Sequence, residues 1–286
     1  MRPNGWSRSC GGGASWRPND LALIADSSGA TRVRHKAFAE IVSAVKAAGD
    51  AVLEVYSEAF EVQAKDDGSP VTEADRRSEE IIVAALRRLT PDLPVIAEES
   101  AGDLSGHPAP SLFWLVDPLD GTKEFISRNG EFTVNVALIE GGMPILGLVL
   151  APALGRLFMA APGITPMIEE ADGRSEIAAR SIPAEGATIV SSRSHGDPEA
   201  LAQFTAGRKI AAQISAGSSL KFCVVAAGQA DIYPRFGRTM EWDTAAGHAV
   251  LLAAGGRVED LKGRPLRYGK PGFENPHFVA YGRGGF

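Results

Sequence analysis

The chain has 286 residues, a formal net charge of −6 and a hydrophobic fraction of 44%. These values argue against disorder and against binding to a nucleic-acid polymer, because such binders depend on clustered Lys and Arg. The two cysteines lie far apart, which predicts no disulfide framework and favours a reducing cytosol. The best apolar window, ILGLVLAPALGRLF, is interrupted by Pro152 and Arg156, so we expect a soluble protein.

Residues 1–34 are rich in Gly, Ser, Arg and Asn and lack the apolar core of a secretory signal. We interpret them as a disordered N-terminal extension, and a misassigned start site explains them equally well. From His35 to Phe60, apolar residues at helical spacing predict a long amphipathic helix. Thr72, three residues before Asp75, predicts the start of a second helix that ends before Pro91.

Two apolar runs then end in acids. The run LPVIAEES predicts a buried strand that ends in Glu98 and Glu99, and LFWLV predicts a strand that ends at Asp117. Next, FTVNVALIE and ILGLVLAP predict an antiparallel pair joined through GGMP. The segment from Ala160 to Pro183 is rich in Gly, Pro and charge, which is typical of a domain junction.

The second half alternates strands with helices. We predict strands in ATIVSSRSH, ADIYPRF and GRVEDL, and helices in SSLKFCVVAAG and DTAAGHAVLLAAGG, the last closed by a double-glycine cap. This alternation indicates an α/β layer, whereas the first half mixes helices with antiparallel strands.

Several acids stand at the edges of apolar elements, where an uncompensated carboxylate is costly to desolvate. With five histidines and no Cys/His cluster, hard oxygen ligands favour Mg²⁺ over zinc. Asp117 and Asp120 form a D-x-x-D pattern. Pro118 and Gly121 favour a turn that would direct both carboxylates toward the same position. Taken singly, each acid could instead cap a helix or face solvent. The acids are Asp75, Glu98, Glu99, Asp117, Asp120 and Asp243.

The ordered set EES, DPLDGT and WDTAAGHAVLLAAGG resembles the inositol monophosphatase-like, lithium-sensitive phosphatase superfamily, from about His35 to the C-terminus. The resemblance implies a fold of mixed α+β and α/β character, the layered α-β-α-β-α sandwich of the sugar phosphatases. We expect residues 35–183 to form an N-terminal α+β domain with most metal ligands. Residues 184–286 would form a C-terminal α/β domain with the nucleotide contacts and the last ligand.

The continuation DGTKEF, with Lys123 and Glu124, resembles the bacterial 3′(2′),5′-bisphosphate nucleotidases of the CysQ type. This implies hydrolysis of the 3′-phosphate of adenosine 3′,5′-bisphosphate to AMP and phosphate, and also of the sulfated form, in sulfate assimilation and nucleotide recycling. The alternative is an inositol-1-phosphate or sugar-phosphate monophosphatase. A non-catalytic nucleotide-binding protein would have lost a metal ligand or the water-activating pair, and all are present here.

The resemblance also implies roles for single residues. Asp75 and Thr122 would activate the attacking water, and Glu98 would be a further catalytic residue. The site would hold two or three Mg²⁺ ions, and Asp117 would bridge two of them. The implied metal ligands are Glu98, Asp117, the Leu119 carbonyl, Asp120 and Asp243. The implied substrate contacts are Glu98, Leu119, Asp120, Gly121, Thr122, His195, Ser218, Ser219, Lys221, Arg235 and Asp243.

Several of these substrate contacts have a second interpretation from the residues alone. An anion-binding site at a helix start would consist of Ser218, Ser219 and Lys221. The two serines could equally cap that helix. His195 could be an ordinary loop residue. Arg235 could grip a second phosphate or stack on a base.

The expected partner is a small nucleotide bisphosphate rather than a nucleic-acid polymer. We expect a cytoplasmic monomer or homodimer. Peripheral association with the cytoplasmic face of the inner membrane is left open.

Overall fold

The computed structural model describes residues 23–25, 31–33, 35–58, 62–64, 70–103, 109–192 and 197–285. Within the segment predicted as a disordered extension, β1 (Leu23–Ala25) and β2 (Thr31–Val33) form an antiparallel pair. The structure gives these two short segments a paired backbone, and the disordered extension stays a prediction. The rest of that segment lies outside the described residues.

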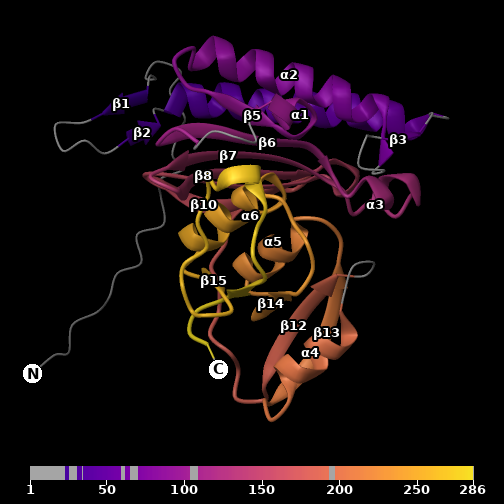
Figure 1. The fold of residues 1–286 in the computed structure, drawn as a ribbon, viewed down its shortest axis with the longest axis vertical. Helices are drawn as coiled ribbons and strands as arrows, with labels where there is room; N and C mark the ends of the chain where they lie inside the picture. Colours follow the sequence, from indigo (N-terminus) through magenta and orange to yellow (C-terminus); the bar gives the residue numbers. More distant parts are fainter. Residues whose placement is uncertain are drawn as a thin grey trace, which may run out of the picture.

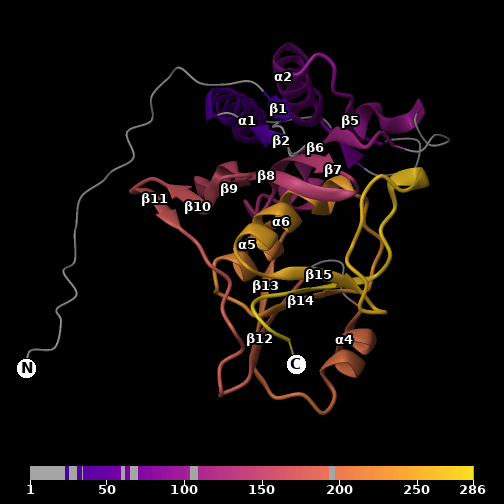
Figure 2. The same ribbon diagram turned by 90° about the vertical axis from the view of Figure 1, so that its left-hand side faces the viewer.

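The two larger sheets of the described chain alternate with layers of helices, as Figures 1 and 2 show. Helices α1 (His35–Ser57) and α2 (Glu73–Leu89) cover one face of a seven-stranded sheet of order β11-β10-β9-β8-β7-β6-β5. Helices α5 (Leu220–Ala226) and α6 (Trp242–Ala253) lie between this sheet and a five-stranded sheet of order β13-β12-β14-β16-β15. Helix α4 (Pro198–Thr205) lies beyond the second sheet. The predicted α-β-α-β-α sandwich is confirmed.

The remaining elements have the following bounds. The seven-stranded sheet contains β5 (Val95–Ala97), β6 (Leu112–Asp120), β7 (Thr133–Glu140), β8 (Met143–Ala151), β9 (Arg156–Ala161), β10 (Ile164–Glu170) and β11 (Gly173–Glu176). The five-stranded sheet contains β12 (Ala187–Ser192), β13 (Ile210–Ala216), β14 (Ile232–Arg235), β15 (Arg257–Asp260) and β16 (Phe278–Tyr281). The short elements are β3 (Gln63–Ala64), β4 (Pro70–Val71), α3 (Thr122–Ile126), and the 3₁₀ turns Glu98–Asp103, Pro152–Leu154 and Pro271–Phe273.

Local signals place the helix ends where the sequence predicts them. The Thr72 hydroxyl accepts a hydrogen bond from the Ala74 N–H, while the Asp75 carboxylate accepts one from the Thr72 N–H, which together form a capping box. Helix α6 ends in a Schellman motif, in which the N–H groups of Gly255 and Gly256 bond back to the carbonyls of Leu252 and Leu251. Among the described helices, none is long and apolar enough to cross a membrane.

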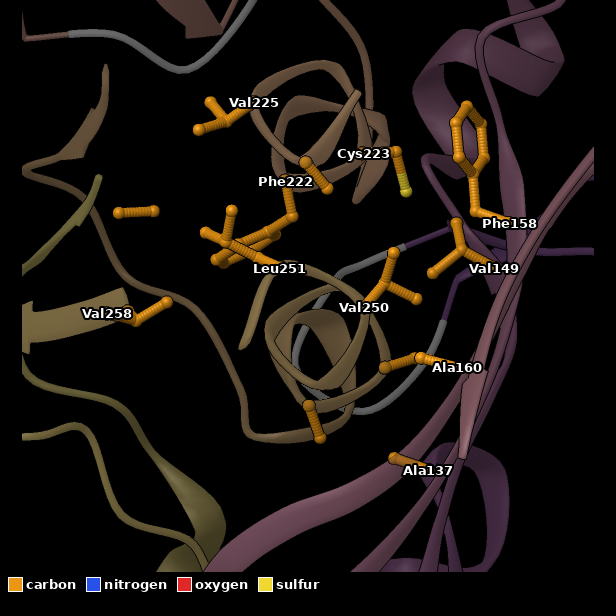
Figure 3. Packing of buried hydrophobic residues seen from close by; sticks show 14 of the residues in the cluster. Ala137, Val149, Phe158, Ala160, Phe222, Cys223, Val225, Val250, Leu251 and Val258 are labelled. Carbon is orange, nitrogen blue, oxygen red and sulfur yellow. The ribbon is translucent and has the colours of Figure 1, made fainter. Parts of the chain in front are cut away.

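Alternation along β6 and β7 separates two apolar cores. Trp114 and Val136 belong to the core under α1 and α2. Leu115 and Ala137 face the other way, into a core that α5 and α6 share with both sheets. In Figure 3, Val149 and Phe158 of the large sheet point toward Cys223 and Val250 of these two helices. Burial of this shared core fixes both helices against the large sheet.

The structure corrects several boundaries. Strand β6 continues past Asp117 to Asp120, because a register shift at this point lets Asp120 pair with Thr133 despite the missing N–H of Pro118. Much of the segment predicted as a junction belongs to β9, β10 and β11, and the chain leaves the large sheet only after Glu176. The division into two domains stays a prediction.

In the second half of the chain, the sequence prediction lacked the helix α4 and the strands β13 and β16. Strand β16 lies between β14 and β15 and pairs antiparallel with both. The strand predicted in GRVEDL is β15, which lies at the edge of this sheet.

A glycine fixes the approach of α6 to the large sheet. A Cβ on Gly147 of β8 would lie 2.2 Å from the Ala246 carbonyl oxygen and 2.8 Å from the Ala249 Cβ, both in α6. We expect Gly147→Ala to lower the free energy of unfolding by about 1–3 kcal/mol, because overpacking forces the helix off the sheet. Urea denaturation measures this loss. The exposed Ala212→Ser on β13 is the control, and equal stability of the two variants would contradict the close packing.

Candidate active site

A cleft of about 260 Å³ opens where the end of β6, the start of α3 and the starts of α5 and α6 meet. Of the predicted site residues, Glu98, Asp120, Gly121, Thr122, Ser218, Lys221, Arg235 and Asp243 line it. The lining residues that were predicted neither as ligands nor as substrate contacts are Lys123, Glu124, Ser192, Phe222, Tyr233, Arg238, Thr239 and Thr244. Lys123 and Glu124 served in the sequence only to indicate the substrate class. The others gave no local signal, because their elements meet only in the folded chain.

Three carboxylates from distant parts of the chain converge beside this cleft. Glu98, Asp117 and Asp243 each place one oxygen within 4.8 Å of the others. Glu98 follows β5, Asp117 lies near the end of β6, and Asp243 lies in the first turn of α6. Strands β5 and β6 are parallel neighbours, so their carboxyl ends deliver acids to the same edge of the sheet.

The carboxylates repel each other strongly. Burial, followed by the charge of Glu98, raises the pKa of Asp117 well above its usual value. Burial, followed by the charge of Asp120, raises the pKa of Asp243 in the same way. The Asp117 side chain is 1% exposed, and its Oδ2 has no hydrogen-bond partner. A buried carboxylate oxygen without a partner, facing two other acids, fits a hard divalent cation.

The turn after Asp117 is held from inside the protein. The Leu119 N–H donates to Asp117 Oδ1 over 3.0 Å, and the Ser78 hydroxyl donates to the Pro118 carbonyl over 2.8 Å. Leu119 itself is buried, and its carbonyl accepts a long 3.5 Å hydrogen bond from the Thr122 hydroxyl. These bonds fix the backbone that carries both aspartates.

Gly121 connects the two halves of the site. Its φ of 87° lies in the left-handed region, and a Cβ there would lie 2.1 Å from the Ser218 hydroxyl. That hydroxyl donates to the carbonyls of Asp120 and Glu131, at 2.9 and 2.8 Å. Ser218 thereby ties the loop before α5 to the loop after β6.

Ser219 is directed into the protein rather than into the cleft. It is 2% exposed, its hydroxyl donates to Asn135 Oδ1 over 2.7 Å, and it bonds the Thr133 hydroxyl over 2.9 Å. Neither this side chain nor that of Ser218 caps a helix. The structure thus gives the two serines internal hydrogen bonds, and their predicted phosphate contacts stay untested.

Basic side chains also line the cleft. Lys221 is 4% exposed, and its ammonium donates to the Ser218 carbonyl over 2.5 Å. Burial lowers the pKa of Lys221 to about 8, although the nearby Asp120 opposes this shift. Burial likewise raises the pKa of Asp120 to about 6, against the opposing charge of Lys221. Arg235 and Arg238 line the same cleft, so its lining offers carboxylates for cations and basic groups for anions.

Of the two residues predicted to activate the water, the described lining of the cleft contains one. Thr122 lines the cleft, whereas Asp75 is not among its described lining residues. Asp75 is 2% exposed, and its Oδ2 accepts hydrogen bonds from the N–H and the hydroxyl of Thr72, both at 2.8 Å. His195 lies outside the described residues. The roles of these side chains stay predictions.

The repulsion between the acids has a measurable consequence. In EDTA at neutral pH, we expect Asp117→Asn to raise the melting temperature by at least about 3 °C, since 1 kcal/mol shifts it by roughly 2–4 °C in a domain of this size. A raised carboxyl pKa means that ionisation destabilises the fold above that pKa, and the amide removes this cost. The advantage should shrink as the pH falls and Asp117 is protonated. Differential scanning fluorimetry measures it, and a lower melting temperature would contradict the repulsion.

Curated relatives match most of the chain. It is 48% identical over 242 residues to the 3′(2′),5′-bisphosphate nucleotidase CysQ of Escherichia coli K12, covering 84% of this chain and 97% of that protein. The CysQ of Buchnera aphidicola is 41% identical over 246 residues, covering 84% and 92%.

Solved structures agree with this fold. The crystal structure of CysQ from Bacteroides thetaiotaomicron has a TM-score of 0.75 and 36% identity, covering 86% of this chain and 97% of that one. A Thermotoga maritima IMPase has a TM-score of 0.70 at 24% identity, covering 85% and 90%, which is evidence for the fold alone. The family model described as the inositol monophosphatase family matches residues 34–280. The chain therefore belongs to the inositol monophosphatase family.

Proposed function

We propose that this protein is a Mg²⁺-dependent 3′(2′),5′-bisphosphate nucleotidase. Its substrate would be adenosine 3′,5′-bisphosphate, from which it removes the 3′-phosphate to leave AMP and phosphate, with the sulfated form as a second substrate. The observation that carries this proposal is one cleft whose lining combines converging carboxylates with Lys221, Arg235 and Arg238. The names of the curated relatives support the same activity.

The converging carboxylates would hold two or three Mg²⁺ ions. Glu98, Asp117 and Asp243 already converge within the span of one ion, and the Asp120 carboxylate and Leu119 carbonyl would complete the set. When bound, Mg²⁺ would neutralise phosphoryl oxygens and lower the pKa of a coordinated water. The fixed turn of β6 orients Asp117 before any ion binds, since Oδ1 is held by the Leu119 N–H.

Asp75 and Thr122 would move the proton of the attacking water. A threonine hydroxyl is too weak a base alone, so a carboxylate must accept its proton. The carboxylate that would do this is held by Thr72, whose N–H and hydroxyl both donate to Oδ2 of Asp75. The backbone at Gly121, which has no side chain, would let the phosphate approach closely.

The basic side chains that line the cleft would bind the second phosphate. Arg235 would donate to phosphate oxygens in the bidentate geometry that guanidinium allows. Lys221 would screen the substrate from Asp120, and the exposed Lys123 adds charge at the rim. An inositol monophosphate has no second phosphate for these basic side chains to bind.

Three further properties belong to this proposal. We infer inhibition by Li⁺, a cytoplasmic location, and a monomeric or homodimeric state. The absence of a membrane-spanning helix among the described residues is compatible with this location.

A parallel assay of two substrates tests the activity. With Mg²⁺, we expect kcat/KM for adenosine 3′,5′-bisphosphate to exceed that for inositol 1-phosphate by at least about tenfold, since one charge-assisted hydrogen bond to the second phosphate contributes about 1.5–3 kcal/mol. EDTA should abolish phosphate release and Li⁺ should inhibit it. A preference for inositol 1-phosphate would favour the monophosphatase alternative, and no Mg²⁺-dependent release from either would refute the proposal.

Arg235→Ala tests the second-phosphate contact. We expect KM for adenosine 3′,5′-bisphosphate to rise about tenfold or more, with little change for adenosine 3′-monophosphate, which lacks the second phosphate. Steady-state kinetics on both substrates provides the comparison. The exposed Arg264, which pairs with Asp260 far from the cleft, provides the control variant Arg264→Ala. Equal losses on both substrates would show that Arg235 does not bind the second phosphate.

A further inference from the structure

Asn275 lies directly behind the wall of the cleft, between the 3₁₀ turn Pro271–Phe273 and β16. It is 6% exposed. Its Nδ2 lies 2.7 Å from the Met240 carbonyl oxygen, 3.0 Å from the Thr244 hydroxyl and 3.3 Å from the Thr239 hydroxyl. Both threonines line the cleft. One amide therefore contacts three points of the backbone and side chains that begin α6.

The contact with Met240 leads to a metal-ligand candidate. The Met240 carbonyl accepts from Asn275, and the Met240 N–H donates to Asp243 Oδ2 over 2.8 Å. Asp243 is one of the three converging carboxylates. Its orientation thus depends on a backbone unit that Asn275 holds from the opposite side.

The amide of Asn275 is held in one orientation. The Lys270 ammonium, which has only donors, lies 3.2 Å from Oδ1 of Asn275, while the Met240 carbonyl, which has only acceptors, faces Nδ2. A swap of the two atoms would place donor against donor and acceptor against acceptor.

Glu241 fixes this lysine in turn. Its side chain is completely buried, forms an ion pair with Lys270 at 2.5 Å, and accepts hydrogen bonds from the N–H groups of Gly269 and Lys270, at 2.6 and 2.9 Å. A buried carboxylate is tolerated when a cation and backbone donors satisfy it in this way. The segment from Gly269 to Asn275 is thereby anchored to the start of α6.

We propose that Asn275 is a positioning residue, which sets Asp243 for Mg²⁺ and holds Thr239 and Thr244 in place at the substrate-facing wall. The inference rests on the proposed function for its substrate, but the predicted effect on Mg²⁺ binding does not. Groups that orient metal ligands typically change metal affinity by about 10–100-fold when they are lost. Loss of the amide donor releases the Met240 carbonyl, so the backbone of Met240 can turn and move the N–H that holds the Asp243 carboxylate.

The test uses Asn275→Asp, which keeps the size and the acceptor for Lys270 but removes the donor to Met240. We expect the Mg²⁺ dissociation constant, measured by isothermal titration calorimetry, to rise about tenfold. KM for the substrate should rise as well, because the wall threonines lose their partner. Asn275→Ser, whose hydroxyl can keep one donor, should show a smaller rise.

A matched control separates positioning from general stability. Thr90→Val removes a buried hydrogen-bonding group under α2, on the far face of the large sheet, and should lower the melting temperature without changing Mg²⁺ affinity. Mg²⁺ dissociation constants within twofold of the wild type for both Asn275 variants would overturn the proposal. If Asn275→Asp does not fold, Asn275→Ser decides by the same criterion. Wild-type protein that binds Mg²⁺ but releases no phosphate would refute the proposed function while leaving this test intact.

Discussion

The mutual repulsion of buried carboxylates is the constraint on which this structure depends. Asp117 and Asp243 lose hydration on folding and face Glu98 at close range, so the pKa of each aspartate rises. Such a cluster destabilises the fold of the protein without metal. A divalent cation removes this repulsion, so the same cluster favours cation binding. The fold must therefore hold the acids together without help from favourable contacts among themselves. Hydrogen bonds and close packing elsewhere supply that support.

The support comes from two sheets rather than from one. Asp117 is mounted on the large sheet, whereas Asp243 is mounted on a helix that both sheets share. Gly147 lets that helix approach the large sheet closely, and Ser218 ties the loop before α5 to the backbone of Asp120. A metal ion bound between the acids would add a further link between the same two halves. Binding of such an ion would therefore be coupled to the packing of the two halves.

The charges that line the cleft account for a bisphosphate better than for a monophosphate. The repelling acids need cations, whereas Lys221 and Arg235 in the same lining need anions. The lowered pKa of Lys221, caused first by burial, shows that this cation is held at an energetic cost. A ligand with one phosphate on the bound cations and a second phosphate on these basic groups would relieve both costs. The electrostatic design thus agrees with the activity named for the curated relatives.

The sequence by itself determined the elements whose signals are local. The capping box at Thr72, the apolar runs of β7 and β8 with the glycine turn between them, and the two glycines after α6 act within a few residues, so their patterns are readable without the fold. The order EES, DPLDGT and WD also identified the acids through family resemblance. Only the tertiary structure decided that Ser219 faces the interior and that Asn275 supports the start of α6. These contacts join residues more than thirty positions apart, and no local propensity encodes which of many polar side chains will meet.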